Sequence, residues 1–329
     1  MVRSIVLPLL ALAGLLALPP SRGVAAETIR VGILKFGTVN WEIDTILHNK
    51  LDAANAVQLD VRVLASNEAT KVAIQAGEVD VIVSDWLFVS RMRADGVPLT
   101  FAPYSTSVGA IMVPPGSTAR TLADLKGAKL GVAGGPLDKN WLAIRGMAQA
   151  QLGFDLQAET EQAFGAPPLL MEKLKQGELQ AALNYWNYNA QLESEGYRQI
   201  VTGQEAARAL GAAGDISAIG YVFNETWADA NRPTMLAFLA ASTQAKDLLA
   251  TSDAEWQRLR PLMNAEDEAV FQNLVRRYRE GIPSRPVVEE ERDTAKVYQE
   301  LARIGGEELV GKATELAPGT FWSALKQGS

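Results

Sequence analysis

Hydrophobic and polar residues along this chain follow two periods in turn, one typical of strands and one typical of helices. Residues 28–34 (TIRVGIL) alternate and are rich in β-branched side chains, which predicts a strand. The same criteria predict, in order, a helix at 40–51, a strand at 57–64, a helix capped by Asn67 and ended at Gly77, and a strand at 79–83. This β-α-β-α-β order predicts a parallel sheet with right-handed crossovers.

The same alternation returns further along the chain. Thr121 and Asp124 are the two ends of a capping box (TLAD) on a short helix that Gly127 ends. Beyond it we expect a strand at 129–133, helices at 141–152 and 169–176, and strands at 179–184 and 218–223.

From Arg232 onward the chain has a mostly helical pattern. We expect one helix to start at Asn264, with Glu266 and Asp267 in its first turn, and to end at Gly281. Its apolar residues share one helix face: Phe271, Leu274, Val275 and Tyr278. We interpret this stripe as core and not as a binding site.

Two stretches of the chain repeat one another at an offset of 100 residues. The matching positions are Gly77 and Gly177, Glu78 and Glu178, Trp86 and Trp186, Asn40 and Asn140, and Trp41 and Trp141. Short Gly-Glu matches arise by chance, but four tryptophans in register argue for two similar α/β units.

All four of these tryptophans follow the carboxyl end of a predicted strand. Ligands of open parallel sheets bind beyond those ends, so two facing units would bring the rings to one shared cleft. There they would stack on a flat ring or hold a cation. The alternative is that the rings fill the core, and the sequence leaves both open.

The first 26 residues have the pattern of a secretory signal peptide. Arg3 is followed by an almost purely apolar run over 5–18 and by the small residues Val24, Ala25 and Ala26. A membrane anchor would need about 20 apolar residues, which is more than this run supplies. We therefore expect cleavage after Ala26 and a periplasmic, secreted protein that is not inserted in the membrane.

Composition excludes several classes of protein. The net charge of −7 lacks the basic excess of nucleic-acid binders. There is no Cys and one His, which excludes disulfides, thiolate metal sites, Cys nucleophiles and a His-rich metal site. Nothing in the sequence indicates a metal, a cofactor or a catalytic pair, and no G-x-x-x-x-G-K-[ST] motif is present. We expect no enzyme; an exported enzyme on the same fold is the alternative.

Several segments resemble periplasmic solute-binding proteins of ABC importers, of the nitrate/sulfonate/taurine type. They are residues 111–117 (IMVPPGS), 121–132 (TLADLKGAKLGV), 174–183 (LKQGELQAAL) and 232–239 (RPTMLAFL). The resemblance covers most of the mature chain and is specific for the fold and the broad role. Gln180 departs from it, because the family often has Asp at this position.

The resemblance implies an α/β, two-lobed periplasmic-binding-protein fold of type II. Each lobe would be a mostly parallel sheet flanked by helices, with lobe 1 formed by 27–112 and 215–329 and lobe 2 by 113–214. Two crossings, near 109–114 and 211–217, would act as hinges. The implied role is capture of a small solute by a monomer that docks on a membrane permease, with no nucleic acid involved.

Candidate ligand-binding residues lie in the loops that the two lobes would bring together. They are Thr38, Asn40, Trp41, Asp85, Trp86, Ser105, Thr106, Ser107, Gly135, Leu137, Asp138, Asn184, Trp186 and Asp215. Several have structural alternatives: Thr38, Asn40, Asp85 and Asp138 are suited to capping helices, and Ser105, Thr106 and Ser107 to a solvated loop.

The charge of the ligand stays open. The resemblance favours a small organic anion such as a sulfonate or nitrate, which the turn at Gly134-Gly135 and Lys139 would receive at a helix N-terminus. The tryptophans with Asp85, Asp138 and Asp215 suit an amine, a quaternary ammonium or an aromatic compound instead. A hard cation is a further variant, and a ligand sensor or accessory protein is an alternative role.

Overall fold

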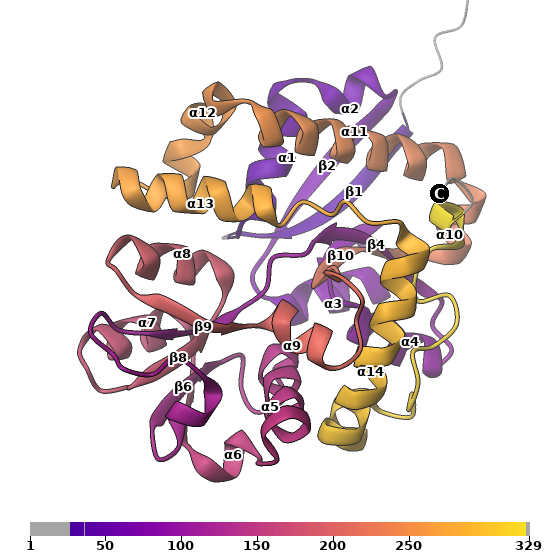
Figure 1. Cartoon of the computed structure of the whole chain (residues 1–329). Helices are drawn as coiled ribbons and strands as arrows, with labels where there is room; N and C mark the ends of the chain where they lie inside the picture. The colour runs from indigo at the N-terminus through magenta and orange to yellow at the C-terminus, as the bar shows by residue number, and fades with distance from the viewer. Residues whose placement is uncertain (1–26, 36, 327–329) are drawn as a thin grey trace, which may run out of the picture.

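The computed structural model describes residues 27–35 and 37–326; the expected signal peptide lies outside these residues. Two five-stranded sheets form the molecule (Figure 1). The first has the order β2 (Val57–Leu64), β1 (Glu27–Leu34), β3 (Val81–Ser84), β10 (Ile219–Asn224), β4 (Leu99–Ser105). The second has the order β7 (Glu161–Gly165), β6 (Lys129–Ala133), β8 (Ala181–Asn184), β5 (Ala110–Val113), β9 (Arg198–Thr202).

The two sheets share one topology. In the first, β1 is parallel to β2 and β3, whereas β10 is antiparallel to both of its neighbours. In the second, β6 is parallel to β7 and β8, whereas β5 is antiparallel to both of its neighbours. The reversed strand of each sheet is the one that arrives from the other sheet. This confirms the predicted α/β fold class with two mostly parallel sheets, and its symmetry matches the repeat seen in the sequence.

Helices cover both sheets (Figure 1). Those of the first lobe are α1 (Val39–His48), α2 (Leu51–Ala54), α3 (Asn67–Gln75), α4 (Trp86–Ala94), α10 (Glu225–Ala230), α11 (Arg232–Thr251), α12 (Asp253–Met263), α13 (Glu268–Glu280) and α14 (Val287–Val310). Those of the second lobe are α5 (Lys139–Leu152), α6 (Leu156–Glu159), α7 (Pro167–Lys175), α8 (Trp186–Ser194) and α9 (Gly203–Ala209). Short 3₁₀ turns lie at Leu122–Leu125 and Ser323–Lys326.

The helix ends in the structure agree with some of the predicted ones and differ from others. The capping box of Thr121 and Asp124 is present. Ser66, and not Asn67, caps α3 by accepting a hydrogen bond from an amide of the first turn. Asn264 was expected to start a helix, but it ends α12 in the left-handed conformation with φ 52°, and Asp267 caps α13.

The expected helix at 40–51 breaks into α1 and α2 because Lys50 takes the left-handed conformation. In contrast, the apolar stripe of α13 is buried, which confirms the helical period that the sequence predicts for it.

Two crossings connect the lobes. The first lies between β4, which ends at Ser105, and β5, which begins at Ala110; the second lies between α9 and β10. The boundary expected after Met112 therefore falls inside β5. We propose that lobe 1 comprises 27–105 with 219–326, and that lobe 2 comprises 110–209.

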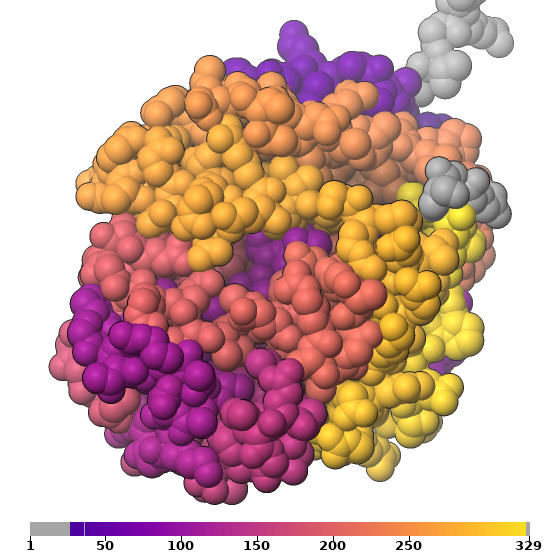
Figure 2. All heavy atoms as spheres, viewed as in Figure 1, coloured from indigo at the N-terminus to yellow at the C-terminus, as the bar shows by residue number. Residues whose placement is uncertain are grey.

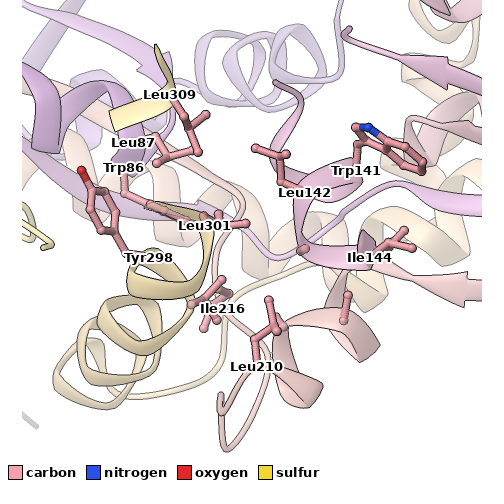
Figure 3. Packing of buried hydrophobic residues seen from close by; sticks show 14 of the residues in the cluster. Trp86, Leu87, Trp141, Leu142, Ile144, Leu210, Ile216, Tyr298, Leu301 and Leu309 are labelled. Atoms are coloured by element: carbon pink, nitrogen blue, oxygen red, sulfur yellow. The ribbon is translucent and has the colours of Figure 1, made fainter. Parts of the chain in front are cut away.

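Helix α14 joins the cores of the two lobes. Tyr298 and Leu301 of this helix are buried beside Trp86 of lobe 1, and the same hydrophobic cluster continues to Leu142 and Leu210 of lobe 2 (Figure 3). The apolar surface of α14 is thus divided between both lobes, and its burial stabilises their association.

We predict that Leu301→Ala lowers the free energy of unfolding by about 2–5 kcal/mol, because it removes buried methylene groups from the junction of both cores. Leu236→Ala, at a leucine that is 39% exposed on α11, should change it by less than about 0.5 kcal/mol. Urea denaturation of the three proteins measures both values. Equal, small changes would show that the α14 junction adds little to stability.

Candidate functional site

The loops at the carboxyl ends of the parallel strands face one another between the lobes. The surface view shows a hollow below α13, drawn in orange, with purple atoms of the first lobe at its base (Figure 2). Side chains of the two lobes meet here: Asp85 Oδ2 lies 3.6 Å from Lys139 Nζ, and the rings of Trp41 and Trp186 meet edge to face at 6.1 Å. Arg276 and Arg277 of α13 also form ion pairs with Glu193 of α8. These contacts identify the interlobe cleft as the candidate site.

Asp85 has a capping role and an interlobe role at once. Its Oδ1 accepts a hydrogen bond from the Phe88 amide at 2.9 Å, which caps α4. Its other oxygen faces Lys139 across the cleft. Burial acts to raise the pKa of Asp85, but the Lys139 ammonium and the Phe88 N–H outweigh it and hold that pKa below its ordinary value. Asp85 is therefore an ionised carboxylate at neutral pH.

Asp138 has the matching position in lobe 2, at the start of α5. Its Oδ1 accepts hydrogen bonds from the amides of Asn140 and Trp141 at 2.9 and 3.1 Å. A Cβ added to Gly134, which has φ +84°, would lie 2.7 Å from Asp138 Oδ2 and 2.9 Å from the Tyr185 hydroxyl. Only glycine fits this close approach, which brings the second carboxylate oxygen and the phenol together.

The pKa values of Asp138 and Tyr185 are both raised, first of all by burial. Burial raises the pKa of Asp138, and neither Lys139 nor the two amide hydrogen bonds reverse that shift. The pKa of Tyr185 rises to about 12, first through burial and then through the negative charges of Asp138 and Asp85. The two aspartates and the phenol thus share one electrostatic environment.

The tryptophans do not form a four-ring cage. Trp141 is 0% exposed, and Trp86, a predicted ligand residue, is 2% exposed with its Nε1 donating to the Ser217 carbonyl at 3.0 Å. Trp41 is also buried, against Trp256 and Tyr278. Of the four repeated rings only Trp186 is half-buried. Trp141 therefore lies in the core. Trp41 and Trp86 are buried too, but Trp41 meets Trp186 across the lobes and Trp86 lines the interlobe cavity described below.

Other predicted residues serve the backbone. The buried Asn184 donates to the Pro167 carbonyl and accepts from the Tyr185 amide, both at 2.9 Å, so its amide group is fully engaged within lobe 2. Asp215 forms an ion pair with Arg208 at the second crossing, and it is not among the residues that line the interlobe cavity described below.

The first crossing is tied to α13 and not spread along the cleft wall. Ser105 Oγ accepts from the Ser107 amide at 3.1 Å, and the Thr106 amide donates to the Gly281 carbonyl at 2.8 Å. Ser107 Oγ donates to the Arg277 carbonyl at 3.4 Å. These contacts show three hydroxyl residues holding a hinge strand in place.

The remaining candidates lie on the two loops that open the cleft. Thr38 precedes α1 without a side-chain capping bond, and Asn40 Nδ2 donates to the Lys35 carbonyl at 3.2 Å. Gly135 has φ +91°, and Leu137 is half-buried against the core. Thr38, Asn40 and Gly135 therefore stay candidates for ligand contact, and Leu137 stays one of lesser weight.

Gln204, which the sequence does not indicate as a site residue, forms hydrogen bonds to both crossings. Its Nε2 donates to the carbonyls of Thr106 at 2.6 Å and Ile216 at 2.9 Å, and its Oε1 accepts from the Ile216 amide at 3.2 Å. It also lines a cavity of about 30 Å³ between the lobes, together with Trp86, Lys139, Asn140 and Val297 among others. That volume has room for about one water molecule. A glutamine inside a helix carries no local signal for such a role.

Two buried carboxylates of α14 hold the second crossing. Glu290 accepts from the Ser217 amide and Asp293 from the Ala213 amide, each at 2.9 Å. Asp293 also pairs with Arg285 and Lys296. Burial acts to raise the pKa of Asp293, but these donors outweigh it and lower the pKa to about 2.

A second buried network holds together the lobe 1 elements beside the cleft. The fully buried Glu42 accepts from the hydroxyls of Tyr221 at 2.7 Å, Ser242 at 2.5 Å and Tyr278 at 3.2 Å, and it pairs with Lys246. This network joins α1, α11 and α13 to β10 behind Trp41. The four partners come from distant parts of the chain, so the sequence could not reveal it.

No grouping of three or more His, Cys, Asp or Glu side chains suited to a metal occurs among residues 27–35 and 37–326. Within the same residues, no helix combines the length and apolar character that a membrane crossing requires.

Comparison with known families places this site in context. The NMT1/THI5-like family profile matches residues 55–255, more than half of the chain. The chain belongs to the NMT1/THI5-like family. No curated protein matches it significantly.

Solved structures show the same fold across nearly the whole chain. The periplasmic aliphatic sulphonate binding protein SsuA from Escherichia coli superposes with a TM-score of 0.71 at 18% identity, covering 91% of this chain and 99% of that one. The alkanesulfonate-binding protein SsuA from Xanthomonas axonopodis pv. citri, bound to MOPS, gives 0.67 at 18% identity with the same coverage. An ABC transporter protein from Parabacteroides distasonis gives 0.69 at 13% identity, covering 89% and 98%. The NMT1/THI5-like chain thus has the two-lobed periplasmic-binding-protein fold, as the resemblance implied.

We predict that Gln204→Met lowers the free energy of unfolding by about 1–3 kcal/mol, because it leaves backbone groups of both crossings without partners. The control is Gln191→Met, at a half-buried glutamine whose Nε2 donates a long 3.4 Å hydrogen bond to the Asn187 carbonyl within α8; it should cost less than about 1 kcal/mol. Thermal unfolding of both variants measures the difference. An equal effect of the two would contradict a special role of Gln204.

We predict that Asp293→Asn destabilises the protein at neutral pH and that the difference from the parent protein shrinks as pH falls. The folded-state pKa of about 2 lies below the ordinary 3.8, so the stabilisation is present above pH 4 and is lost as pH falls toward 2. At neutral pH this contribution is of the order of 2 kcal/mol. Denaturation curves between pH 2 and 7 test it, and a constant difference over this range would contradict it.

Proposed function

We propose that this protein is an extracytoplasmic solute-binding protein that captures a small solute in the interlobe cleft. The observation that carries the proposal is the meeting of the two equivalent sheets at their carboxyl ends, where Asp85 and Lys139 pair across the gap. Ligands of such sheets bind at that place. Two braced crossings allow the lobes to close by a hinge motion.

The partner that fits this role is the membrane permease of an ABC importer. The E. coli and Xanthomonas structures are of sulfonate-binding proteins, and the Parabacteroides structure is of an ABC transporter protein. A signal peptide cleaved after Ala26 would place the protein in the periplasm. We expect it to act there as a monomer. The family and the fold support transport and not catalysis.

Two ligand classes remain for experiment. Sulfonates are favoured by the family resemblance and by the two sulfonate-binding proteins among the structural matches. Amines are favoured by the carboxylates of Asp85 and Asp138, the first of which already holds the Lys139 ammonium across the cleft. A periplasmic sensor would bind the same compounds without feeding an importer, and loss of uptake on gene deletion separates the two roles.

Closure can be measured directly because the chain has no cysteine of its own. We predict that spin labels at Gln272→Cys on α13 and Glu195→Cys after α8 move closer together when a solute that raises the melting temperature is added. Both positions are exposed and lie on opposite lobes. A control pair, Gln272→Cys with Lys50→Cys, lies within lobe 1 and should keep its distance.

Pulsed electron–electron double resonance measures both pairs. A distance between lobes that stays the same with every solute that raises the melting temperature would overturn cleft capture. Normal uptake in a deletion strain would favour the sensor.

A further inference from the structure

We propose that the cleft binds its solute through a protonated amine or another cationic nitrogen, held by Oδ2 of Asp138 and, in exchange for Lys139, by Oδ2 of Asp85. The inference rests on the proposed function and names the ligand class of the same cleft.

The first argument concerns the different contacts of the two carboxylate oxygens in each aspartate. In both residues Oδ1 caps a helix. Oδ2 of Asp85 points to Lys139, and Oδ2 of Asp138 lies by Gly134 and the Tyr185 hydroxyl. Capping needs one acceptor only, and Ser66 and Ser252 cap α3 and α12 with neutral hydroxyls. Oδ2 of Asp138 is therefore available for a donor in the cleft, and Oδ2 of Asp85 becomes available when a solute replaces Lys139.

The second argument is charge balance. In the part of the chain that the structure describes, Lys139 is the one cation in ion-pair contact with Asp85, and Asp138 has no ion pair. Three cations on the neighbouring helices are engaged elsewhere: Arg145 with Asp155, Lys246 with Glu42, and Arg277 with Glu193. Lys71 lies over the Phe88 ring at 5.1 Å, and its charge also helps to lower the pKa of Asp85. The two carboxylates therefore share one ammonium in ion-pair contact, that of Lys139.

The pKa values agree with this balance. The pKa of Asp138 stays above its ordinary value in spite of Lys139, and the two carboxylates help to raise the pKa of Tyr185 to about 12. Burial is the first cause of both shifts, and the negative charges of Asp138 and Asp85 add to the rise at Tyr185. A cation entering the cleft would offset these negative charges.

The third argument concerns the anion alternative. The sequence pointed to the N-terminus of α5, with Gly134-Gly135 and Lys139, as an anion receiver. In the structure Asp138 already accepts from the first amides of α5, and Lys139 is turned toward Asp85. A sulfonate there would meet a carboxylate where it needs a donor. The Lys139 ammonium, in contrast, shows that the Asp85 oxygen accepts a cationic nitrogen.

Aromatic rings complete the site from lobe 2. Tyr185 is 38% exposed, and Trp186 is half-buried at the start of α8. Ring faces attract cations as well as apolar groups. An amine that carries an apolar or aromatic body therefore suits the site better than a bare ammonium ion.

The test uses isothermal titration calorimetry of the mature protein with probes of matched body and opposite charge. The pairs are phenethylamine with phenylethanesulfonate, choline with isethionate, and putrescine with ethanedisulfonate. At least one cationic probe is expected to bind, and Asp85→Asn and Asp138→Asn should each weaken it by about tenfold or more, because each removes a charged partner. Asparagine still caps helices, so both variants should fold.

Asp267→Asn is the matched control, because Asp267 caps α13 with one oxygen outside the cleft and is exposed. It should leave the affinity unchanged. The inference is overturned if no cationic probe binds, or if binding is unaffected by both cleft variants. It is also overturned if sulfonates bind and Asp138→Asn tightens them. In that last case spin-label closure with the sulfonate would keep the proposed function intact.

Discussion

The hydrogen bonds of Gln204 are the interaction on which the arrangement of the two lobes depends. One side chain of lobe 2 binds the carbonyls of both backbone crossings and one of their amides. The crossings cannot separate without losing these bonds, so the lobes can turn about them but keep a common axis. Asp293 and Glu290 of α14 fix the second crossing from the other side. Two facing sheets thereby become one site.

Around this hinge, apolar and polar contacts join the lobes at different places. Apolar contacts of α14 join the lobes behind the hinge, where Tyr298 and Leu301 lie between Trp86 and the helices of lobe 2. In front of it the lobes meet through ion pairs, Asp85 with Lys139 and Glu193 with Arg276 and Arg277, and through the edge contact of Trp41 and Trp186. Apolar burial is strong and persistent. A partly exposed ion pair is weak, so the front is where a solute can replace a protein contact.

The sequence revealed the repeated architecture because repetition is local. Trp86 and Trp186, each after a short apolar strand, marked both units before any contact was known. The sequence could not show that the two rings have different surroundings. Trp86 is buried by α14 and Ser217, which lie far along the chain, whereas Trp186 faces the other lobe. Asp85 and Asp138 were found because strand ends and caps are local features. Gln204 and Glu42 were not, because their roles exist only through distant partners.

The central claim is that one solute contacts both lobes at once. Hydrogen-exchange mass spectrometry, with and without a saturating solute that raises the melting temperature, tests it most directly. The account predicts slower exchange both at 84–88, where α4 begins, and at 134–141, where α5 begins. Slower exchange at only one of these segments, or only on the outer helices, would contradict binding between the lobes.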